Sequence, residues 1–220
     1  MLVKLLKKEL RLCLHPAAVI LLLLAALLLV PGYPYGLMYF YLGLGLFFIC
    51  LSARENHDVS FTLCLPVPKK SLVTARFLLA LVLELAQLLL ALALIWLRRK
   101  LYSPAYAANP AGMDANIALI GQGFLCYGLF HLVFFPLHYR DVSKVGGPFV
   151  AASVALGLLI LADIVLSYTV PLFRDVLDSP DPAHTGAKLL FCLLCLVFDS
   201  LATLLALRLS QRRFEKLDIR

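Results

Sequence analysis

Long apolar runs separated by short polar segments make up most of this sequence. The runs lie at about 16–31, 36–53, 72–97, 115–137, 147–168 and 187–208. Most are close to the roughly 20 apolar residues that a helix needs to cross the hydrocarbon core of a bilayer, where a helix satisfies its own backbone hydrogen bonds. The pattern therefore predicts an all-α polytopic membrane protein whose domain at 16–208 holds six transmembrane helices.

The segment before the first run, residues 1–15, is basic and has a helical period. One face of that helix would carry the basic residues Lys4, Lys8, Arg11 and His15, and another face would carry Leu2, Leu6, Leu10 and Cys13. This pattern is typical of an amphipathic helix that lies in the membrane interface against anionic lipid headgroups. The simpler alternative is a charged flank of the first span. At the other end, residues 209–220 are predicted to form a cytoplasmic tail.

Composition and charge support this interpretation and give it a direction. The chain is 62% hydrophobic and only 15% charged, and its mean hydropathy is +0.93, which excludes an ordinary soluble domain of this length. The net charge of +7 does not indicate nucleic acid binding, because the basic residues lie between the apolar runs. Residues 4–11, 54–76, 140–144 and 208–220 hold 15 of the 20 Lys and Arg residues. The positive-inside rule then places both termini in the cytoplasm.

Two details at the opposite side of the membrane complete the predicted topology. The triplet Arg98, Arg99 and Lys100 lies on the predicted outer side, against the charge rule, and we expect it to snorkel to the outer headgroups. Asp114, just before the fourth run, is placed to cap the helix that follows.

Ionisable residues inside the apolar runs are the first functional candidates, because each costs about 2.5–3.5 kcal/mol to insert near the bilayer centre. They are Glu84, His131, Asp163 and Asp199, and Gln87 shares a helical face with Glu84. Glu84, Gln87 and His131 could line a substrate path or could only form hydrogen bonds between packed helices. The sequence contains no P-loop, H-E-x-x-H or G-x-S-x-G motif, so no catalytic residue, metal site or bound cofactor is predicted.

The longest predicted cytoplasmic loop, at 54–71, separates the second and third runs. Its apolar middle, at 59–65, lies between acidic and basic residues, and Pro66 and Pro68 end any helix there. An apolar patch with a charged rim is typical of a protein interface.

The residues that follow this patch resemble the ABC-2 family of ABC transporter permeases, and most of all its short six-span bacterial members. The matching positions are Asp58, Leu65, Pro66, Val67, Lys69, Lys70 and Arg76. Pro68 stands where the family usually has Ser. The opening K-K-E-L and the closing R-R-F-E-K-L-D-I-R are also similar, whereas P-L-H-Y-R-D-V-S-K after the fourth run is similar less closely.

The resemblance implies the membrane half of an ATP-driven exporter in a bacterial plasma membrane. A separate ATPase subunit would bind ATP and Mg and dock on the cytoplasmic loop, residues 1–15 would be an interfacial elbow helix, and a second permease subunit, identical or related, would complete the path. The coupling loop at 54–71, with the start of the next span, would supply Arg54, Glu55, Asp58, Phe61, Leu63, Leu65, Pro66, Lys69, Lys70 and Arg76. Short outer loops favour an amphipathic peptide or a hydrophobic drug as the substrate.

Two other classes stay open. A small polytopic membrane enzyme, or its accessory subunit, should show acidic or His residues converging with a nucleophile or a metal set. A channel or secondary transporter should show inverted repeats or broken helices.

Overall fold

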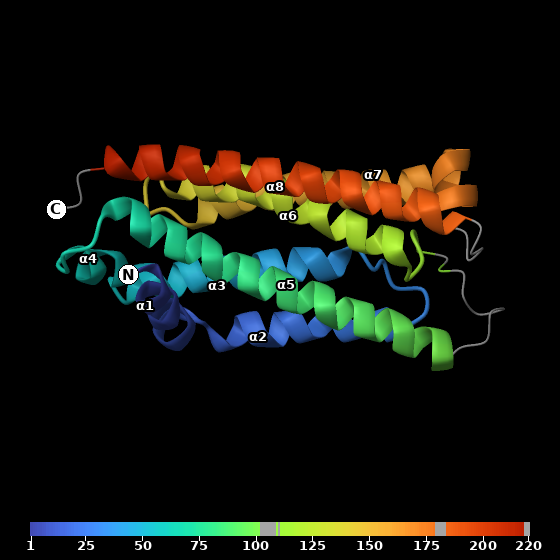
Figure 1. The fold of residues 1–220 in the computed structure, drawn as a ribbon, viewed down its shortest axis with the longest axis horizontal. Coiled ribbons are helices and arrows are strands. Elements are labelled where there is room, and N and C mark those ends of the chain that lie inside the picture. The colour runs from blue at the N-terminus through green and yellow to red at the C-terminus, as the bar shows by residue number, and fades with distance from the viewer. Residues whose placement is uncertain (102–108, 110, 179–183, 218–220) are drawn as a thin grey trace.

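The computed structural model describes residues 1–101, 109, 111–178 and 184–217, and these form a bundle of long helices. Five helices are long and apolar enough to cross a membrane: α3 (Leu37–Glu55), α5 (Lys69–Leu101), α6 (Ile117–His138), α7 (Gly146–Thr169) and α8 (Thr185–Glu215). Figure 1 shows them running along one common axis. The described part of the chain contains no strand, so the predicted all-α membrane fold is confirmed.

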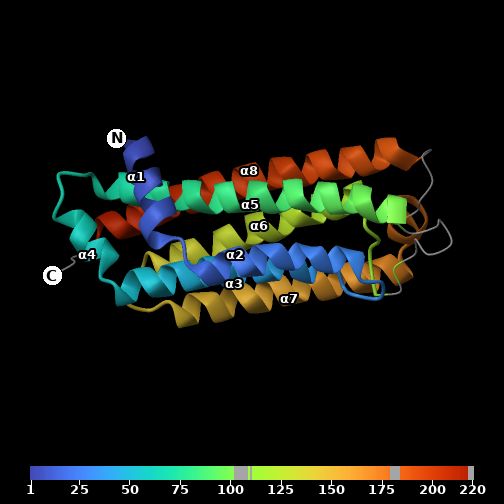
Figure 2. The ribbon, with the colours of Figure 1, turned by 90° about the horizontal axis from the view of Figure 1, so that it is seen from below.

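The chain's bent N-terminal segment brings the number of candidate spans to six if its two parts are counted as one crossing. α1 (Leu2–Lys8) continues as the π-helical turn η1 (Glu9–Cys13), and α2 (Pro16–Leu23) continues as the 3₁₀ helix η2 (Leu24–Leu29). The two parts meet at an angle of 86°. Because a 3₁₀ helix rises about 2.0 Å per residue rather than 1.5 Å, α2 and η2 together reach about 24 Å. Figures 1 and 2 show this segment running along α3, with α1 lying across the bundle.

The bends at 14–16 and 30–36 have local causes. Pro16 occupies the first turn of α2, and the side chain of His15 accepts a hydrogen bond from the Ala17 amide, which caps the helix. After η2, the chain reverses through Pro31 and Gly32, and Gly32 adopts a positive φ of 77°. The reversal places α2 antiparallel to α3.

The spans form two groups that share one core. α2, α3 and α5 lie together on one side, and α6, α7 and α8 lie together on the other (Figure 1). α6 is the most central helix. Of the 18-residue apolar stretch that could span the membrane, 67% is buried in α6, against 17% in α7 and 22% in α8. Met1 and the end of α8 lie at the same end of the bundle as the short helix α4 (Asp58–Leu63), which we call the α4 end (Figure 2).

Helix boundaries differ from the apolar runs mainly at the α4 end. α5 begins at Lys69, and α8 continues to Glu215 beyond the run that ended at 208. The Lys69 ammonium donates to the Leu217 carbonyl over 2.7 Å, and the Gln211 amide donates to the Thr74 hydroxyl over 3.0 Å. Much of the predicted tail is therefore helix packed against α5; its last residues, 218–220, lie outside the described part.

Two expectations at the opposite end are wrong. Asn116, not Asp114, caps α6, since its side chain accepts from the Ala118 and Leu119 amides. The Asp114 carboxylate instead lies 3.4 Å from the guanidinium of Arg98. Within the basic triplet, Arg99 and Lys100 are exposed, but Arg98 does not snorkel outward: it is buried and donates to the Leu28 carbonyl over 2.7 Å and to the Tyr35 hydroxyl.

Glycines let α6 and α8 approach closely. A Cβ added at Gly128 would lie 3.0 Å from the Cα of Asp199, and one at Gly121 would lie 3.0 Å from the Cα of Cys192. Small residues at such crossings are typical of membrane helices, where close van der Waals packing replaces the hydrophobic effect. The contact also sets which residues of α8 face α5 and α6.

We expect Gly128→Leu to lower the free energy of unfolding by about 1–3 kcal/mol, because the added side chain forces the two backbones apart. Chemical denaturation in bicelles would measure the loss. Gly157→Leu is the matched control, since a Cβ at Gly157 in α7 meets nothing within 4 Å. An equal loss in both variants would show that the close α6–α8 contact does not limit stability.

Candidate functional site: an ion-pair network at the α4 end

The α4 end is shaped by a sharp turn after α3. His57 adopts the left-handed conformation, with φ 51° and ψ 30°, which costs a residue with a Cβ roughly 1–2 kcal/mol. This turn separates α4 from α3 at this end of the bundle. Pro66 and Pro68 lie between α4 and the start of α5 and keep the two helices apart. α4 is therefore a short helix held between two spans.

Arg76 is the centre of a buried ion-pair network. Its Nε lies 2.8 Å from Oε2 of Glu9 in η1, and its Nη2 lies 3.2 Å from Oδ2 of Asp58 in α4. Its Nη1 also donates to the Ile49 carbonyl of α3 over 3.5 Å. Since a guanidinium stays charged in proteins, burying it requires these partners. One side chain of α5 thus joins the N-terminal helix, α4 and α3.

Lys8 closes the network from the other side. Its Nζ lies 2.6 Å from Oδ1 of Asp58 and 3.2 Å from Oε1 of Glu9, and it donates to the Thr62 hydroxyl over 2.9 Å. Burial by itself would lower the pKa of the Lys8 ammonium, but the hydrogen bond to Asp58 and the charge of Glu9 outweigh it and raise that pKa above its usual value. Lys8 therefore stays charged at neutral pH.

The same carboxylates form the cluster that best fits a metal among the described residues. Ligand atoms of Glu9, Cys13 and Asp58 lie within 4.8 Å of one another. However, both carboxylates are already paired, and the positive charges of Lys8 and Arg76 balance their two negative charges. Burial also raises the pKa of the Cys13 thiol to about 12, so the thiolate that a metal needs is disfavoured. These donors fit an ion-pair network rather than a metal centre.

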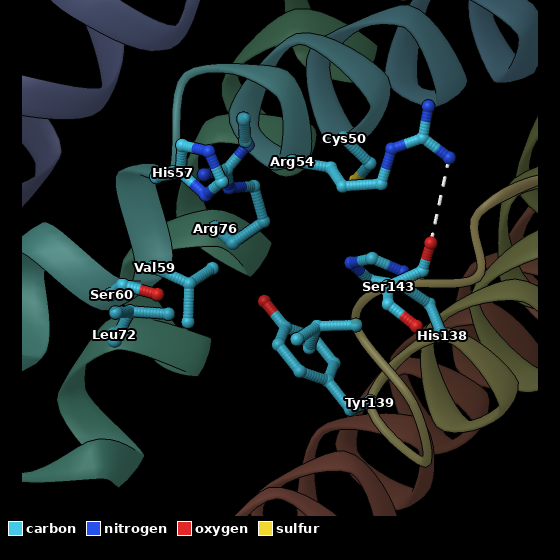
Figure 3. A pocket seen from close by; sticks show the side chains of 12 residues that line it. Cys50, Arg54, His57, Val59, Ser60, Leu72, Arg76, His138, Tyr139 and Ser143 are labelled. Atoms are coloured by element: carbon cyan, nitrogen blue, oxygen red, sulfur yellow. Dashed lines mark hydrogen bonds between the residues drawn. The ribbon is translucent and has the colours of Figure 1, made fainter. Parts of the chain in front are cut away.

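A cavity of about 260 Å³ lies beside the network, between α3, α4, α5 and the connection from α6 to α7. Figure 3 shows Arg54, Val59 and Tyr139 arranged around it. On its rim, Nη1 of Arg54 donates to the Ser143 carbonyl over 3.4 Å, a contact between the two connections at this end. Because α4 has empty space on this side, it has room to move relative to the rest of the bundle.

The residues predicted for the coupling loop separate into three groups. Asp58 and Arg76 lie in the buried network, and Leu63 packs partly buried against the core. Lys69 and Lys70 contact the end of α8, where Lys70 lies 3.2 Å from Glu215. The exposed group is Arg54, Glu55, Phe61, Leu65 and Pro66, of which Phe61 is 66% exposed. This exposed group is available to a partner, and so is Lys70, whose side chain is 56% exposed.

Sequence reasoning missed the part that residues 1–15 contribute to the site. The face of that segment that is buried in the bundle carries Leu5, Glu9 and Cys13. Cys13 belongs to the predicted apolar face, but Leu2 and Leu10 of that face are exposed. One signal was available: Glu9 is the only acidic residue before Glu55. A single acidic residue in a basic helix indicates that its carboxylate pairs with a specific positive charge elsewhere in the fold.

Three of the four predicted intramembrane candidates, Glu84, His131 and Asp199, form a second polar cluster in the middle of the bundle, and Asp163 of α7 is not part of it. Oε1 of Glu84 lies 2.8 Å from Nε2 of His131, so α5 and α6 bring these two side chains together. Gln87 forms its hydrogen bonds with other residues. Its side-chain Nε2 donates to the Met38 carbonyl over 2.9 Å, and its Oε1 accepts from the Tyr127 hydroxyl. It is completely buried and joins α5 to α3 and α6.

We expect Arg76→Met to lower the free energy of unfolding by about 3–5 kcal/mol, because it leaves two buried carboxylates with only Lys8 to balance them. Adding Glu9→Gln should restore part of the loss by removing one unbalanced charge. Denaturant titration in bicelles would measure both. The control is Arg212→Met, an exposed position that should change stability by less than about 0.5 kcal/mol. No recovery in the double variant would argue against charge balance as the role of Arg76.

Comparison with protein-family models finds a match to the ABC-2 family transporter proteins over residues 4–210. Searches of curated proteins and of solved structures found no significant match. The matched range includes Glu9, the α4 region, Arg76 and every described span, so it covers the network as well as the bundle. The chain belongs to the ABC-2 family and is a multi-pass permease component of an ABC transporter.

Proposed function

We propose that this chain is the permease of an ATP-driven exporter in a bacterial plasma membrane, with its α4 end in the cytoplasm. A separate ATPase subunit binds ATP and Mg and docks on α4. The observation that carries the proposal is the network of Arg76, because it ties α4 directly to the N-terminal helix and to α5. A displacement of α4 by the ATPase would therefore move both.

The docking surface in this proposal is the exposed side of α4. Phe61 is 66% exposed and Leu65 is 46% exposed, and both lie outside the apolar windows of the spans. Arg54 and Glu55 lie 3.6 Å apart at its edge. An exposed aromatic side chain with a charged rim is the composition of a protein-binding hot spot.

α5 carries the displacement through the membrane in this proposal. Its 33 residues reach about 50 Å, and no proline interrupts it. At its far end, Arg98 binds the Leu28 carbonyl, Tyr35 and Asp114, so this end of α5 is tied to η2 and to the residues before α6. Moving the α4 end of this long helix would strain the contacts that Arg98 makes at its other end.

The translocation path is proposed to lie between two permease subunits, identical or related. The core of one bundle is too tightly packed to hold a path: a Cβ added at Gly123 would lie 2.6 Å from the ring of Tyr39. Short outer connections give no platform for a large polymer, which favours an amphipathic peptide or a hydrophobic drug as the cargo.

One observation bears on the alternative of a membrane enzyme. The His131 ring lies between an acid and a hydroxyl: its Nε2 is 2.8 Å from Oε1 of Glu84, and its Nδ1 is 2.7 Å from Oγ1 of Thr203. This is the order of the acid, histidine and nucleophile in a catalytic triad. However, the Thr203 hydroxyl donates its single proton to Asp199 over 3.2 Å. In this arrangement the Thr203 proton points away from His131, which favours the permease over the enzyme.

We expect Phe61→Asp to weaken co-purification with the partner ATPase by about tenfold or more, because it places a charge in an apolar contact. The matched control is Leu172→Asp in η4 (Leu172–Leu177), an equally exposed apolar residue at the opposite end of the bundle. If both variants, or neither, lose the ATPase, α4 is not its docking surface.

The orientation can be tested through the native cysteines. Cys64, next to α4, is exposed, while Cys13, Cys50, Cys126 and Cys195 are buried and Cys192 is partly covered within α8. We expect a membrane-impermeant maleimide to label Cys64 in inside-out vesicles and not in intact cells. Bound ATPase should slow the labelling by covering α4. Cys64→Ser is the control that identifies the labelled residue, and labelling from outside intact cells would reverse the topology.

A further inference from the structure

A groove of about 490 Å³ opens on the membrane-facing side of the bundle, between α5, α6 and α8. Most of its wall is hydrocarbon, contributed by Leu81, Leu85, Leu88, Phe124, Leu196 and Leu204. Leu85 and Leu204 are more than half exposed, so the groove opens toward lipid rather than toward the core. Its size is that of a pocket for a drug-sized molecule.

The floor of this groove is polar. Glu84 and Asp199 line it together with Tyr127 and Thr203, although Glu84 is only 3% exposed and Asp199 only 8%. Glu84 lies 15 residues after the start of α5, at about the middle of the span. Two carboxylates near the bilayer centre need protons or nearby positive charges to balance their negative charge.

Counting protons along the cluster shows how much compensation is present. With Asp199 ionised, the Thr203 hydroxyl donates its only proton to Asp199, so it must accept from Nδ1–H of His131. One further proton lies between Nε2 of His131 and Oε1 of Glu84. Whichever of the two holds it, the Glu84–His131 pair has no net charge. The negative charge of Asp199 is then unbalanced.

Nothing else along the groove supplies the missing positive charge. None of the described residues that line it is a lysine or an arginine. The second oxygens of Glu84 and Asp199 have no hydrogen-bond or ion-pair partner among the described residues. The groove thus combines a hydrocarbon wall with acceptor oxygens and, when Asp199 is ionised, one negative charge that no described residue lining the groove compensates.

We propose that this groove binds a lipophilic amine that enters sideways from the bilayer. Its ammonium group would lie against Asp199 and the free oxygen of Glu84, and its apolar body would lie along the leucine wall. The proposal rests on the transport function above, for which it names a substrate class and an entry site separate from a path between subunits.

Other sources of positive charge fit less well. A metal ion such as calcium needs six to eight oxygen ligands, whereas leucine side chains dominate this groove. The amine of a phospholipid headgroup stays at the interface, about 15 Å from the bilayer centre. A second copy of the chain would bring its described Lys and Arg side chains near the ends of its spans, not to this depth.

The test uses the full-length chain in lipid nanodiscs without the ATPase and a photoreactive diazirine analogue of dodecylamine. We expect labelled peptides from α5 and α8, with labelling that dodecylamine competes and dodecanol at the same concentration does not. Asp199→Asn keeps the shape and the acceptor for Thr203 but removes the charge, and should cut specific labelling by about tenfold or more. Asp163→Asn, the same change at an intramembrane position outside the groove lining, should stay within about twofold of wild type.

Leu204→Trp provides a second variant that leaves the charges intact. It fills the groove from its exposed side and should also remove specific labelling. Equal labelling of wild type and Asp199→Asn, equal competition by dodecanol, or labelling only outside α5, α6 and α8 would overturn the proposal. Because no ATPase is present, failure here leaves the docking of the ATPase on α4 untouched, and failure of the Phe61 test leaves this groove untouched.

Discussion

Arg76 enters the bundle where α3, α4 and α5 meet, and its guanidinium cannot become neutral there. A charge at such a position must be balanced within hydrogen-bonding distance, and the chain balances it with Glu9 at 2.8 Å and Asp58 at 3.2 Å. Because these two carboxylates belong to different segments, satisfying one side chain brings three parts of the chain together. The arrangement of the α4 end depends on this requirement, since neither α1 nor α4 is long enough to be a stable helix alone.

The same requirement recurs along α5. At its middle, Glu84 meets His131 of α6 at 2.8 Å, and at its far end Arg98 meets Asp114 at 3.4 Å. Each contact joins α5 to another helix or connection, so this helix is linked to most of the bundle by charged or polar groups. Apolar packing against lipid has little direction of its own, whereas a buried charge accepts only a few geometries. The polar contacts therefore define how the apolar helices are arranged.

The two polar clusters differ in how completely they are balanced. At the α4 end, two positive charges meet two negative charges, and the result suits a joint that transmits displacement. In the middle of the bundle, Glu84 and His131 neutralise each other while Asp199 remains beside an open groove. A network whose charges are fully balanced suits a contact that holds helices together. A cluster that keeps unpaired acceptor oxygens beside a groove suits a binding site.

Much of this protein followed from the order of its residues. Apolar runs predicted the spans because lipid leaves the backbone no partner but itself. The segment from Asp58 to Arg76 indicated the ABC-2 family, which the family match confirms. The partners of Glu9, Thr203 and Arg98 were not predictable, because they lie as far as 72 positions away along the chain. Residues 1–15 show the same limit: hydrophobic periodicity does not tell which side chains face the bundle and which face lipid, because apolar side chains suit both. The sequence by itself determined that the chain crosses the bilayer and where; only the tertiary structure decided which charges meet, since burial sets that pairing across helices rather than along the chain.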